Sequence, residues 1–398
     1  MTLTVVGVDG GRLPPGAAEA LARAEVVAGA ARHLDAVAAV AAMPAPAERI
    51  VLGPVEPALG TLAGRRGVLL ASGDPGFFGI VRLLRAHGVE PVVLPALSSV
   101  QRAFARIGRS WDDVAVVSAH GRDLRPALNV CRARAATAVL TAPGAGPAEI
   151  AAGLDGWRRT LVVAERLGEP GERVVTLDPA AAAAREWDPV AVVLCLRDPD
   201  VVPARGWYAG GEPVPPAGGW ALPDEEFAHR AGMVTKAEVR ALALARLAPR
   251  PGTLVWDVGA GSGSVAVECA RLGAAALAVE RRPDDAGRVA ANAAAHGVDV
   301  RVVPGEAPEV LAGLPAPDAV FVGGGGPQVV PAVAAAGPAR VVVALAALDR
   351  LAPARTALAT AGYAVDGVQL AASRFAELPD GAVRLAATNP ILLLWGEK

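Results

Sequence analysis

Cysteine, lysine and aromatic residues are scarce in this chain of 398 residues, and each scarcity excludes something. The three cysteines, Cys131, Cys195 and Cys269, lie far apart without metal-ligand spacing, which argues against a disulfide or zinc framework and fits a reducing cytoplasm. A net charge of −2, 4% aromatic residues and no basic run argue against nucleic-acid binding. No apolar run reaches ~18 residues without Gly, Pro or charge, so we expect a soluble cytoplasmic protein that binds no membrane and no metal.

Lysine and asparagine are almost absent from the chain. Of 38 basic residues only Lys236 and Lys398 are lysine, and asparagine occurs only at 129, 292 and 389. In such a composition, a retained lysine or asparagine favours a specific role. Lys236 is therefore a candidate catalytic residue, and the alternative is a solvated side chain in the first turn of a helix.

Two blocks of short apolar runs alternate with alanine-rich helical segments, which is the pattern of parallel α/β architecture. The length suits two domains of roughly 200 residues each. Between the blocks, proline and glycine concentrate in residues 199–223 and leave no regular element. We expect domains at 1–204 and 224–398, joined by a linker at 205–223.

Residues 254–268 have the pattern of a strand, a tight turn and a helix. Gly259, Gly261 and Gly263 would allow positive φ angles and let a ligand approach without meeting a Cβ. Seventeen residues after Gly263, a second apolar run ends in Glu280, where a carboxylate can accept both hydroxyls of a ribose. The pattern indicates a nucleoside site with two anchors.

The glycine spacing distinguishes between nucleosides. A dinucleotide fold asks for G-x-G-x-x-G/A, but Ser264 occupies the third position and the turn reads G-x-G-x-G. Asp257 before the turn would repel a pyrophosphate and tolerate a cationic methionine group. The segment therefore resembles motif I of the S-adenosylmethionine (SAM) dependent methyltransferases with a Rossmann-like fold.

Further polar residues of the C-terminal block stand next to predicted elements. Thr235 followed by Glu238 has the pattern of a helix capping box. Glu306 follows one apolar run, Gly323 opens four consecutive glycines after another, and Asn389 precedes a closing strand. Four glycines can be a flexible loop, but ligands bind at the carboxyl ends of parallel strands, which favours a functional role.

The N-terminal block carries its own constellation. A strand at 68–72 runs into the turn Gly73-Asp74-Pro75 and the aromatic pair Phe77-Phe78, which could equally belong to a core. Ser98-Ser99 and His120-Gly121-Arg122 each follow another apolar strand. His120 is either a structural histidine or a member of a cleft at these strand ends.

Together these motifs carry a family resemblance over nearly the whole chain. The N-terminal ones, with residues 29–34, resemble the tetrapyrrole methylases of cobalamin biosynthesis, specifically the precorrin carbon-5 methyltransferases. The C-terminal ones resemble the decarboxylating carbon-15 methyltransferases. The ordered fusion resembles the precorrin-6Y C5,15-methyltransferase (decarboxylating) family.

The resemblance implies an α/β fold: an N-terminal tetrapyrrole methylase of two α/β subdomains, then a Rossmann-like SAM-dependent methyltransferase domain. It implies methylation of precorrin-6Y/6B at carbons 5 and 15 with decarboxylation of a ring acetate, giving precorrin-8 in cobalamin biosynthesis, by a homo-oligomer. Cofactor contacts are expected from Gly73, Asp74, Phe78, Ser98, Ser99, His120, Thr235, Asp257, Gly259, Gly261, Gly263, Glu280, Glu306 and Gly323. Substrate contacts are expected from Arg32, Arg122, Arg374, Arg384 and Asn389, because guanidinium pairs with carboxylates.

Two positions depart from the family pattern. The first loop is usually G-x-G-P-G, whereas here Asp9 replaces the second glycine, and it could repel an acidic macrocycle. Ala142 stands where the family usually has Asp.

The expected chemistry requires little from the side chains. SAM carries an electrophilic methyl and an enamine carbon of a reduced tetrapyrrole is nucleophilic, so positioning supplies most of the catalysis. The catalytic residues are unknown, with Lys236 and His120 as candidates, and the sequence does not identify a proton donor. The alternatives are an NAD-dependent oxidoreductase, an RNA or protein methyltransferase and a non-catalytic SAM-sensing module, and equilibrium binding of SAM against NAD separates the first from the rest.

Overall fold

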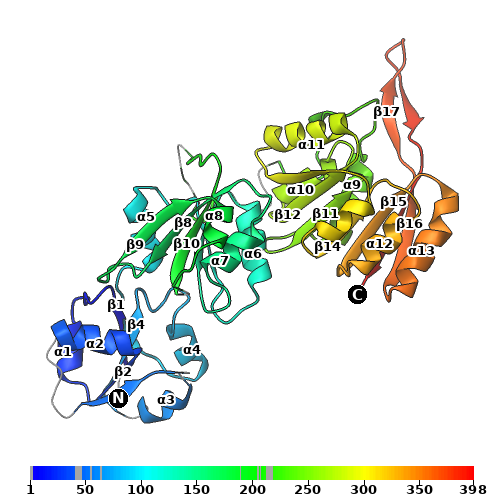
Figure 1. The fold of residues 1–398 in the computed structure, drawn as a ribbon. Coiled ribbons are helices and arrows are strands. Elements are labelled where there is room, and N and C mark those ends of the chain that lie inside the picture. Colours follow the sequence, from blue (N-terminus) through cyan, green and yellow to red (C-terminus); the bar gives the residue numbers. More distant parts are fainter. Residues whose placement is uncertain are drawn as a thin grey trace.

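Three lobes follow one another along the chain in the computed structural model (Figure 1). The structure describes residues 3–40, 47–53, 56–62, 65–188, 190–203, 206, 208–211 and 218–398. The first two lobes form the N-terminal half, and the third carries the glycine turn.

The first lobe is a five-stranded parallel sheet of order β3-β2-β4-β1-β5. Its strands are rich in Val and Leu because helices cover the sheet. The elements are β1 (Thr4–Val8), α1 (Ala17–Ala22), β2 (Val26–Gly29), α2 (Ala31–Val40), β3 (Glu48–Val51), α3 (Glu56–Leu62), β4 (Gly67–Ser72), α4 (Val81–Ala86) and β5 (Val92–Leu94).

The second lobe has a mixed sheet of order β6-β7-β10-β8-β9, which corrects the expectation of parallel strands throughout. Only the β6–β7 pair is parallel, and β10 runs antiparallel to both β7 and β8. The short loop at 166–172 joins β8 to β9 as antiparallel neighbours. The elements are α5 (Ser99–Ile107), β6 (Ala115–Ser118), α6 (Leu124–Ala133), β7 (Ala136–Leu140), α7 (Pro147–Gly153), β8 (Arg159–Glu165), β9 (Arg173–Leu177), α8 (Pro179–Ala183) and β10 (Ala191–Arg197).

The third lobe is a seven-stranded sheet of order β13-β12-β11-β14-β15-β19-β16, in which β19 runs antiparallel to its neighbours. The predicted strand-turn-helix is β11 followed by α10, and the closing strand is β19. The elements are α9 (Ala237–Leu247), β11 (Leu254–Val258), α10 (Ser264–Arg271), β12 (Ala275–Glu280), α11 (Pro283–Ala295), β13 (Val300–Pro304), β14 (Ala319–Val322), α12 (Val329–Ala335), β15 (Arg340–Leu345), α13 (Leu351–Thr360), β16 (Ala364–Leu370) and β19 (Ile391–Glu397), with short 3₁₀ turns at Asp224–Glu226, Glu309–Gly313 and Leu348–Arg350.

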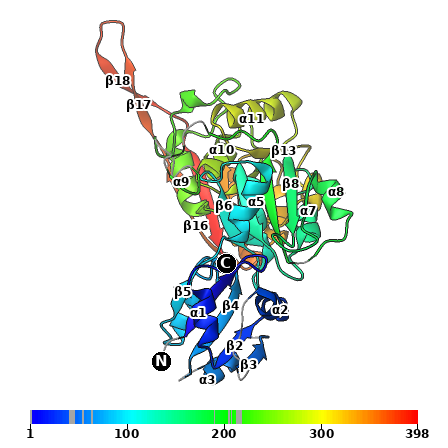
Figure 2. The same cartoon turned by 90° about the vertical axis from the view of Figure 1, so that its left-hand side faces the viewer.

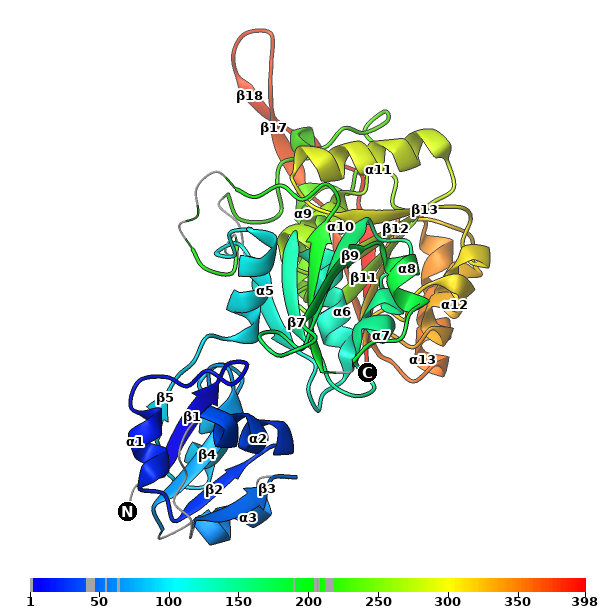
Figure 3. The same cartoon turned by 60° about the vertical axis from the view of Figure 1, so that its left-hand side comes forward.

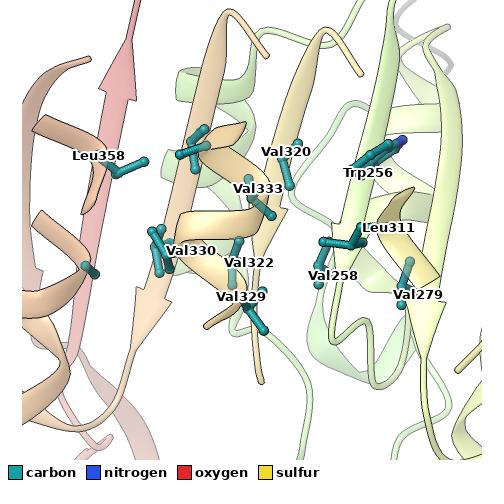
Figure 4. Close-up of a cluster of buried hydrophobic side chains, with 14 of the residues drawn as sticks. Trp256, Val258, Val279, Leu311, Val320, Val322, Val329, Val330, Val333 and Leu358 are labelled. Atoms are coloured by element: carbon teal, nitrogen blue, oxygen red, sulfur yellow. The ribbon is translucent and has the colours of Figure 1, made fainter. Parts of the chain in front are cut away.

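The core of the third lobe lies between the sheet and its helices (Figure 4). Every residue of β11 is buried, because this central strand is covered on both faces. Figure 4 shows side chains of the sheet facing those of α12 and α13: Trp256, Val258, Val279, Val320 and Val322 against Val329, Val330, Val333 and Leu358.

A two-stranded hairpin projects from the third lobe (Figure 2). Its strands are β17 (Ser373–Glu377) and β18 (Val383–Ala387), with Phe375 opposite Leu385 and Arg374 opposite Ala386. Because side chains alternate between faces, Phe375, Leu385 and Val383 share one face, and Arg374 and Arg384 share the other.

The second lobe packs against the third along a polar and apolar interface (Figure 3). Trp157 of the second lobe is buried in the core cluster of the third. Arg159, whose side chain is fully buried, pairs with Asp299 at 2.5 Å. Asn129 donates to the Gly252 carbonyl at 3.0 Å and to Asp318 at 3.3 Å.

The predicted linker at 205–223 lies partly outside the described residues, namely at 205, 207 and 212–217. Its described residues contain no helix or strand. Gly210 donates to the Asp112 carbonyl at 2.8 Å, so this part of the linker lies against the second lobe.

Candidate active sites

A cleft of about 720 Å³ lies between the first and second lobes. It opens at the carboxyl ends of β1, β4, β6 and β7, and the loops that follow these strands form part of its lining. Seven of the expected contact residues line it: Arg32, Gly73, Asp74, Phe78, Ser98, Ser99 and His120. Arg122 is exposed and does not line this cleft.

The first loop is held across the cleft by an ion pair. Asp9 accepts a hydrogen bond from Arg102 on α5, and both side chains are almost buried. Gly10 packs so closely on the Gly168 carbonyl that any Cβ would clash. Arg102 therefore neutralises the carboxylate that we expected to repel an acidic macrocycle, and Asp9 joins the two lobes instead.

Ala142, the other departure, is 4% exposed and belongs to a tight turn closed by the Ala145 amide on the Ala142 carbonyl at 2.9 Å. It does not line the cleft, whereas Thr141 beside it does. This alanine therefore adds no charge to the cleft wall.

The turn after β4 packs against the start of α5. Gly73 has φ +60°, and a Cβ there would come within 3.0 Å of the Leu97 carbonyl. Ser98 caps α5 by accepting from the Gln101 amide at 3.2 Å, while Gln101 accepts from the Ser98 amide at 2.9 Å. The Ser98 hydroxyl is thus already used as a helix cap, although sequence reasoning assigned it to the cofactor.

Arg32 is oriented by two neighbours, Ser72 and His33, neither of which was predicted as a site residue. Its guanidinium donates to Ser72 Oγ at 3.1 Å and to His33 Nε2 at 3.3 Å, and Ser72 Oγ lies 3.0 Å from the same imidazole nitrogen. Burial, and secondarily Arg32, lowers the pKa of His33 to about 4. His33 is therefore neutral near pH 7 and can accept from Arg32, and its place directly after Arg32 was the signal available in the sequence.

Phe77 and Phe78 are not core residues. They form an edge-to-face pair with centroids 5.0 Å apart, and they remain 37% and 41% exposed at the cleft. Phe78 has φ +53°, a conformation that costs a non-glycine residue about 1 kcal/mol. The turn thus presents an apolar corner to the cleft.

The three glycines of the C-terminal turn have positive φ angles as expected, but for different reasons. A Cβ on Gly259 would lie 2.8 Å from the backbone of Gly324, and one on Gly263 would lie 2.6 Å from Val289. Only Gly261, with φ +56°, has open space where its Cβ would be. Gly261 therefore leaves the space that ligand access requires, whereas Gly259 and Gly263 make room for protein atoms.

Glu280 lies at the end of β12, beside this turn. It is 7% exposed and accepts from the Gly261 amide at 2.9 Å and from the Arg282 amide at 2.9 Å. Each carboxylate oxygen can accept more than one hydrogen bond, so both can still accept from a ribose. The two amides fix the carboxylate at the edge of the turn.

Asp257 is buried on β11 under the same turn. Its Oδ2 accepts from the Ala266 amide at 3.0 Å, while Oδ1 has no hydrogen-bond partner among the described residues. Burial, and to a lesser degree the charge of Glu280, raises the pKa of Asp257 to about 7.

We expect Asp257→Asn to stabilise the protein more at pH 8 than at pH 5. The folded pKa of about 7 exceeds the ordinary value of 3.8, so the folded state binds more protons between these pH values and stability falls as pH rises through them. The Asn variant should lack this loss, which is at most about 4 kcal/mol over the whole range and about 3 kcal/mol between pH 5 and pH 8. Urea unfolding of both proteins at pH 5 and pH 8 measures it, and an equal difference at the two pH values would contradict it.

The capping box predicted at Thr235 is wrong. Helix α9 begins after Lys236, and neither Thr235 nor Lys236 caps it with a side chain. The carboxylate of Asp224, 4% exposed, accepts from the Ala237 amide at 2.9 Å and takes that role from a distant segment.

Lys236 and Arg374 converge on the same Asp224 carboxylate. Lys236 Nζ lies 3.4 Å and an Arg374 guanidinium nitrogen 3.0 Å from Asp224 Oδ2. Arg374 also pairs with Glu238 through both carboxylate oxygens, at 3.2 and 3.0 Å. The retained lysine thus has a specific ionic partner, and Arg374 holds the base of the hairpin to α9.

The remaining expected residues are spread more widely. Glu306 is exposed and pairs with Arg281 at 3.1 Å. Gly323 follows β14 and packs near the Gly259 carbonyl, whereas Arg384 and Asn389 are exposed on and after the hairpin. The structure gathers Asp257, Gly261, Glu280 and Gly323 at one edge of the sheet but leaves Arg384 on the projecting hairpin.

Within the described residues, no group of His, Cys, Asp and Glu has the arrangement of a metal site. The same residues contain no helix long and apolar enough to cross a membrane.

Two family models match the chain in order. The Tetrapyrrole (Corrin/Porphyrin) Methylases model matches residues 2–181, and the Precorrin methyltransferase domain model matches residues 225–375. These matches confirm the expected fold class and the resemblance of each half.

Three curated proteins illustrate the similarity. A precorrin-6Y C(5,15)-methyltransferase (decarboxylating) from a Sinorhizobium species is 42% identical over 345 residues, or 82% of this chain and 79% of that protein. A cobalt-precorrin-7 C(5)-methyltransferase from Salmonella typhimurium is 37% identical over 48% of this chain and 98% of its own length. A probable cobalt-precorrin-6B C(15)-methyltransferase (decarboxylating) from Pyrobaculum calidifontis is 38% identical over 44% of this chain and 93% of its own length.

The two shorter relatives each span about half of this chain, as expected if two functional units are fused in it. The first relative matches most of both chains, and the two domain models follow each other in the same polypeptide. By this identity and this domain order, the chain belongs to the precorrin-6Y C5,15-methyltransferase (decarboxylating) family.

Proposed function

We propose that this protein methylates precorrin-6Y at carbons 5 and 15 and removes carbon dioxide from a ring acetate, giving precorrin-8 in cobalamin biosynthesis. The observation that carries the proposal is the ordered pair of matching domains, each with its own glycine-bearing strand end. An NAD-dependent oxidoreductase, an RNA or protein methyltransferase and a SAM-sensing module fit this pair less well.

The co-substrate is SAM, which supplies an electrophilic methyl group when bound. The residues of the third lobe fit it: Gly261 leaves open space, the Glu280 carboxylate can still accept from ribose hydroxyls, and Asp257 has a buried oxygen without a hydrogen-bond partner among the described residues. In the N-terminal cleft, the expected contacts are Gly73, Asp74, Phe78, Ser98, Ser99 and His120. The Thr235 and Glu306 contacts remain predictions.

The protein's part in the chemistry is to bind and orient. A nucleophilic ring carbon held in line with the methyl group needs no strong base, because positioning can lower a barrier by up to ~7–11 kcal/mol. The decarboxylation ends with a proton delivered to carbon. Lys236, beside Asp224, is our candidate donor in the third lobe, whereas His120 is the candidate catalytic residue of the N-terminal cleft.

We assign carbon-5 methylation to residues 1–204 and carbon-15 methylation with decarboxylation to residues 224–398. The half-length relatives with these separate activities in their names support the assignment. Substrate carboxylates would meet Arg32 in the first site, and Arg374, Arg384 and Asn389 near the second.

Mass analysis of products tests the proposal. The purified protein is incubated with precorrin-6Y and methyl-labelled SAM, and the expected product carries two labelled methyl groups and has lost one carbon dioxide. A product without label, or turnover with NAD instead of SAM, would overturn it.

We further propose that the protein forms a homo-oligomer through the hairpin of β17 and β18. Its apolar face exposes Phe375, Leu385 and Val383 at 85%, 65% and 60%. A projecting strand pair with unpaired edges and an apolar face is suited to pairing with a second copy of the chain.

Phe375→Asp should therefore shift the protein to monomers, because it places a charge in the centre of this apolar face. Light scattering after size-exclusion chromatography measures the mass. Leu348→Asp serves as the control, since Leu348 is 73% exposed but lies outside the hairpin. An unchanged mass for Phe375→Asp would contradict the proposed interface.

A further inference from the structure

Arg166 has an unusual backbone for an arginine. It follows β8 directly and has φ +52°, in the left-handed region that favours glycine. The turn is closed by the Glu169 amide, which donates to the Arg166 carbonyl at 2.9 Å. Strained positions of this kind cluster at functional sites, and Arg166 lines the cleft between the first two lobes.

The loop that carries Arg166 is fixed from both sides. The Gly168 amide donates to Glu172 at 2.6 Å, and Glu172 also pairs with Arg106 on α5. The Arg106 hydrogen bond lowers the pKa of Glu172 to about 2. Gly10 of the first lobe closes on Gly168, so the loop presents Arg166 at a defined place.

The guanidinium groups of the other cleft arginines have closer protein partners than the guanidinium group of Arg166. Arg102 is paired with Asp9, and Arg32 donates to His33 and Ser72. Arg166 is 53% exposed, and its Nε lies 3.9 Å from Glu169, which is beyond hydrogen-bond distance.

Two other acidic residues of the lining are already engaged locally. Asp74 accepts from the Gly76 amide at 2.8 Å, and Asp188 accepts from the Val190 amide at 2.9 Å. Neither is paired with Arg166 in the structure, so its guanidinium can serve a ligand.

We propose that Arg166 determines specificity by binding a side-chain carboxylate of the tetrapyrrole from the second lobe, while Arg32 faces the same cleft from the first. The inference rests on the proposed function and adds a residue to it. A planar guanidinium binds a carboxylate through two parallel hydrogen bonds, which requires the fixed presentation that this loop provides. The left-handed backbone of Arg166, although unfavourable for an arginine, then holds its side chain in this position.

Arg166→Gly separates binding from folding. Glycine adopts this φ without strain, so the variant should melt at the same temperature as the wild type or higher. Its dissociation constant for precorrin-6Y, titrated by absorbance, should rise about tenfold or more, which corresponds to a lost charge-assisted hydrogen-bond pair. SAM affinity, measured by calorimetry, should not change.

Two further variants and a modified substrate show whether the effect comes from the Arg166 guanidinium and a substrate carboxylate. Arg166→Lys should bind between the wild type and Arg166→Gly, because it keeps the charge without the fork. Arg185→Gly, at an exposed arginine in the same lobe outside the lining, should bind as the wild type does. The methyl ester of the substrate should bind wild type and Arg166→Gly equally.

Wild-type affinity for the free acid in Arg166→Gly would overturn this inference and leave the proposed function standing. Failure of the wild type itself to bind or methylate the tetrapyrrole would overturn both.

Discussion

The Gly261→Arg variant should release no carbon dioxide from precorrin-6Y and should bind no SAM in its third lobe. Nothing lies within 4 Å of the place where the Gly261 Cβ would be, so a long side chain can be accommodated by the fold while it fills the turn. The φ of +56° costs a non-glycine residue on the order of 1 kcal/mol, which a folded domain tolerates. Trapped carbon dioxide and calorimetric SAM titration are the measurements.

Gly261→Ala is the matched control, because it carries the same backbone cost without the bulk. It should keep most of the decarboxylation. The converse variant is Ser118→Trp, which adds bulk at the end of β6 in the cleft. It should still release carbon dioxide and add a single methyl group.

Ser118→Trp is preferable to a substitution at Gly73, where a Cβ would press on the Leu97 carbonyl and disturb the fold. If Ser118→Trp loses decarboxylation while its third-lobe SAM binding is intact, the division of labour between the halves is wrong.

Arg240→Ala should destabilise the third lobe by up to about 3–5 kcal/mol, the usual cost of removing one partner of a buried ion pair. Arg240 and Glu268 are both fully buried with an Nε to Oε1 distance of 3.2 Å. The same guanidinium donates to the Thr235 and Leu222 carbonyls and lies 4.7 Å from the Phe227 ring centroid. Its loss would leave these carbonyls without this donor and Glu268 with Arg271, at 3.2 Å, as its remaining ion-pair partner. Urea unfolding measures the effect.

Arg281→Ala is the control for this pair. Arg281 and Glu306 are separated by a similar 3.1 Å, but their side chains are 66% and 64% exposed. Exposed pairs contribute about 0–1 kcal/mol, so this variant should unfold nearly as the wild type does. Similar losses for the two variants would show that burial does not set the strength of the Arg240 pair.

Periodic and glycine-marked features of the fold could be predicted from the sequence. The turn after β11 required positive φ at Gly259, Gly261 and Gly263, and local sequence is enough to specify that. The scarcity of asparagine also carried information: Asn292 is buried and makes three hydrogen bonds, with Ala228 and Ser262, and Asn129 joins two lobes. Asn389, in contrast, is exposed.

Contacts between distant segments could not be predicted. The cap of α9 comes from Asp224, thirteen residues before Ala237, so the local Thr235-Glu238 pattern pointed to the wrong residue. Arg102 and Asp9 are 93 positions apart, and only the closed cleft shows that their charges cancel. The choice among 36 arginines likewise depends on the cleft, which places Arg166 in the lining and leaves Arg122 out.

The interface around Trp157 joins parts of the chain that we assign to different catalytic halves. Because this side chain is buried in the core of the third lobe, we expect the second and third lobes to unfold together as one cooperative unit. One wall of the cleft in the tetrapyrrole methylase half is then formed by a lobe of that unit, and the other wall is joined to it by the Asp9–Arg102 ion pair. A perturbation in the third lobe would reach one wall of the other active site through unfolding equilibria alone, without any ligand passing between the sites.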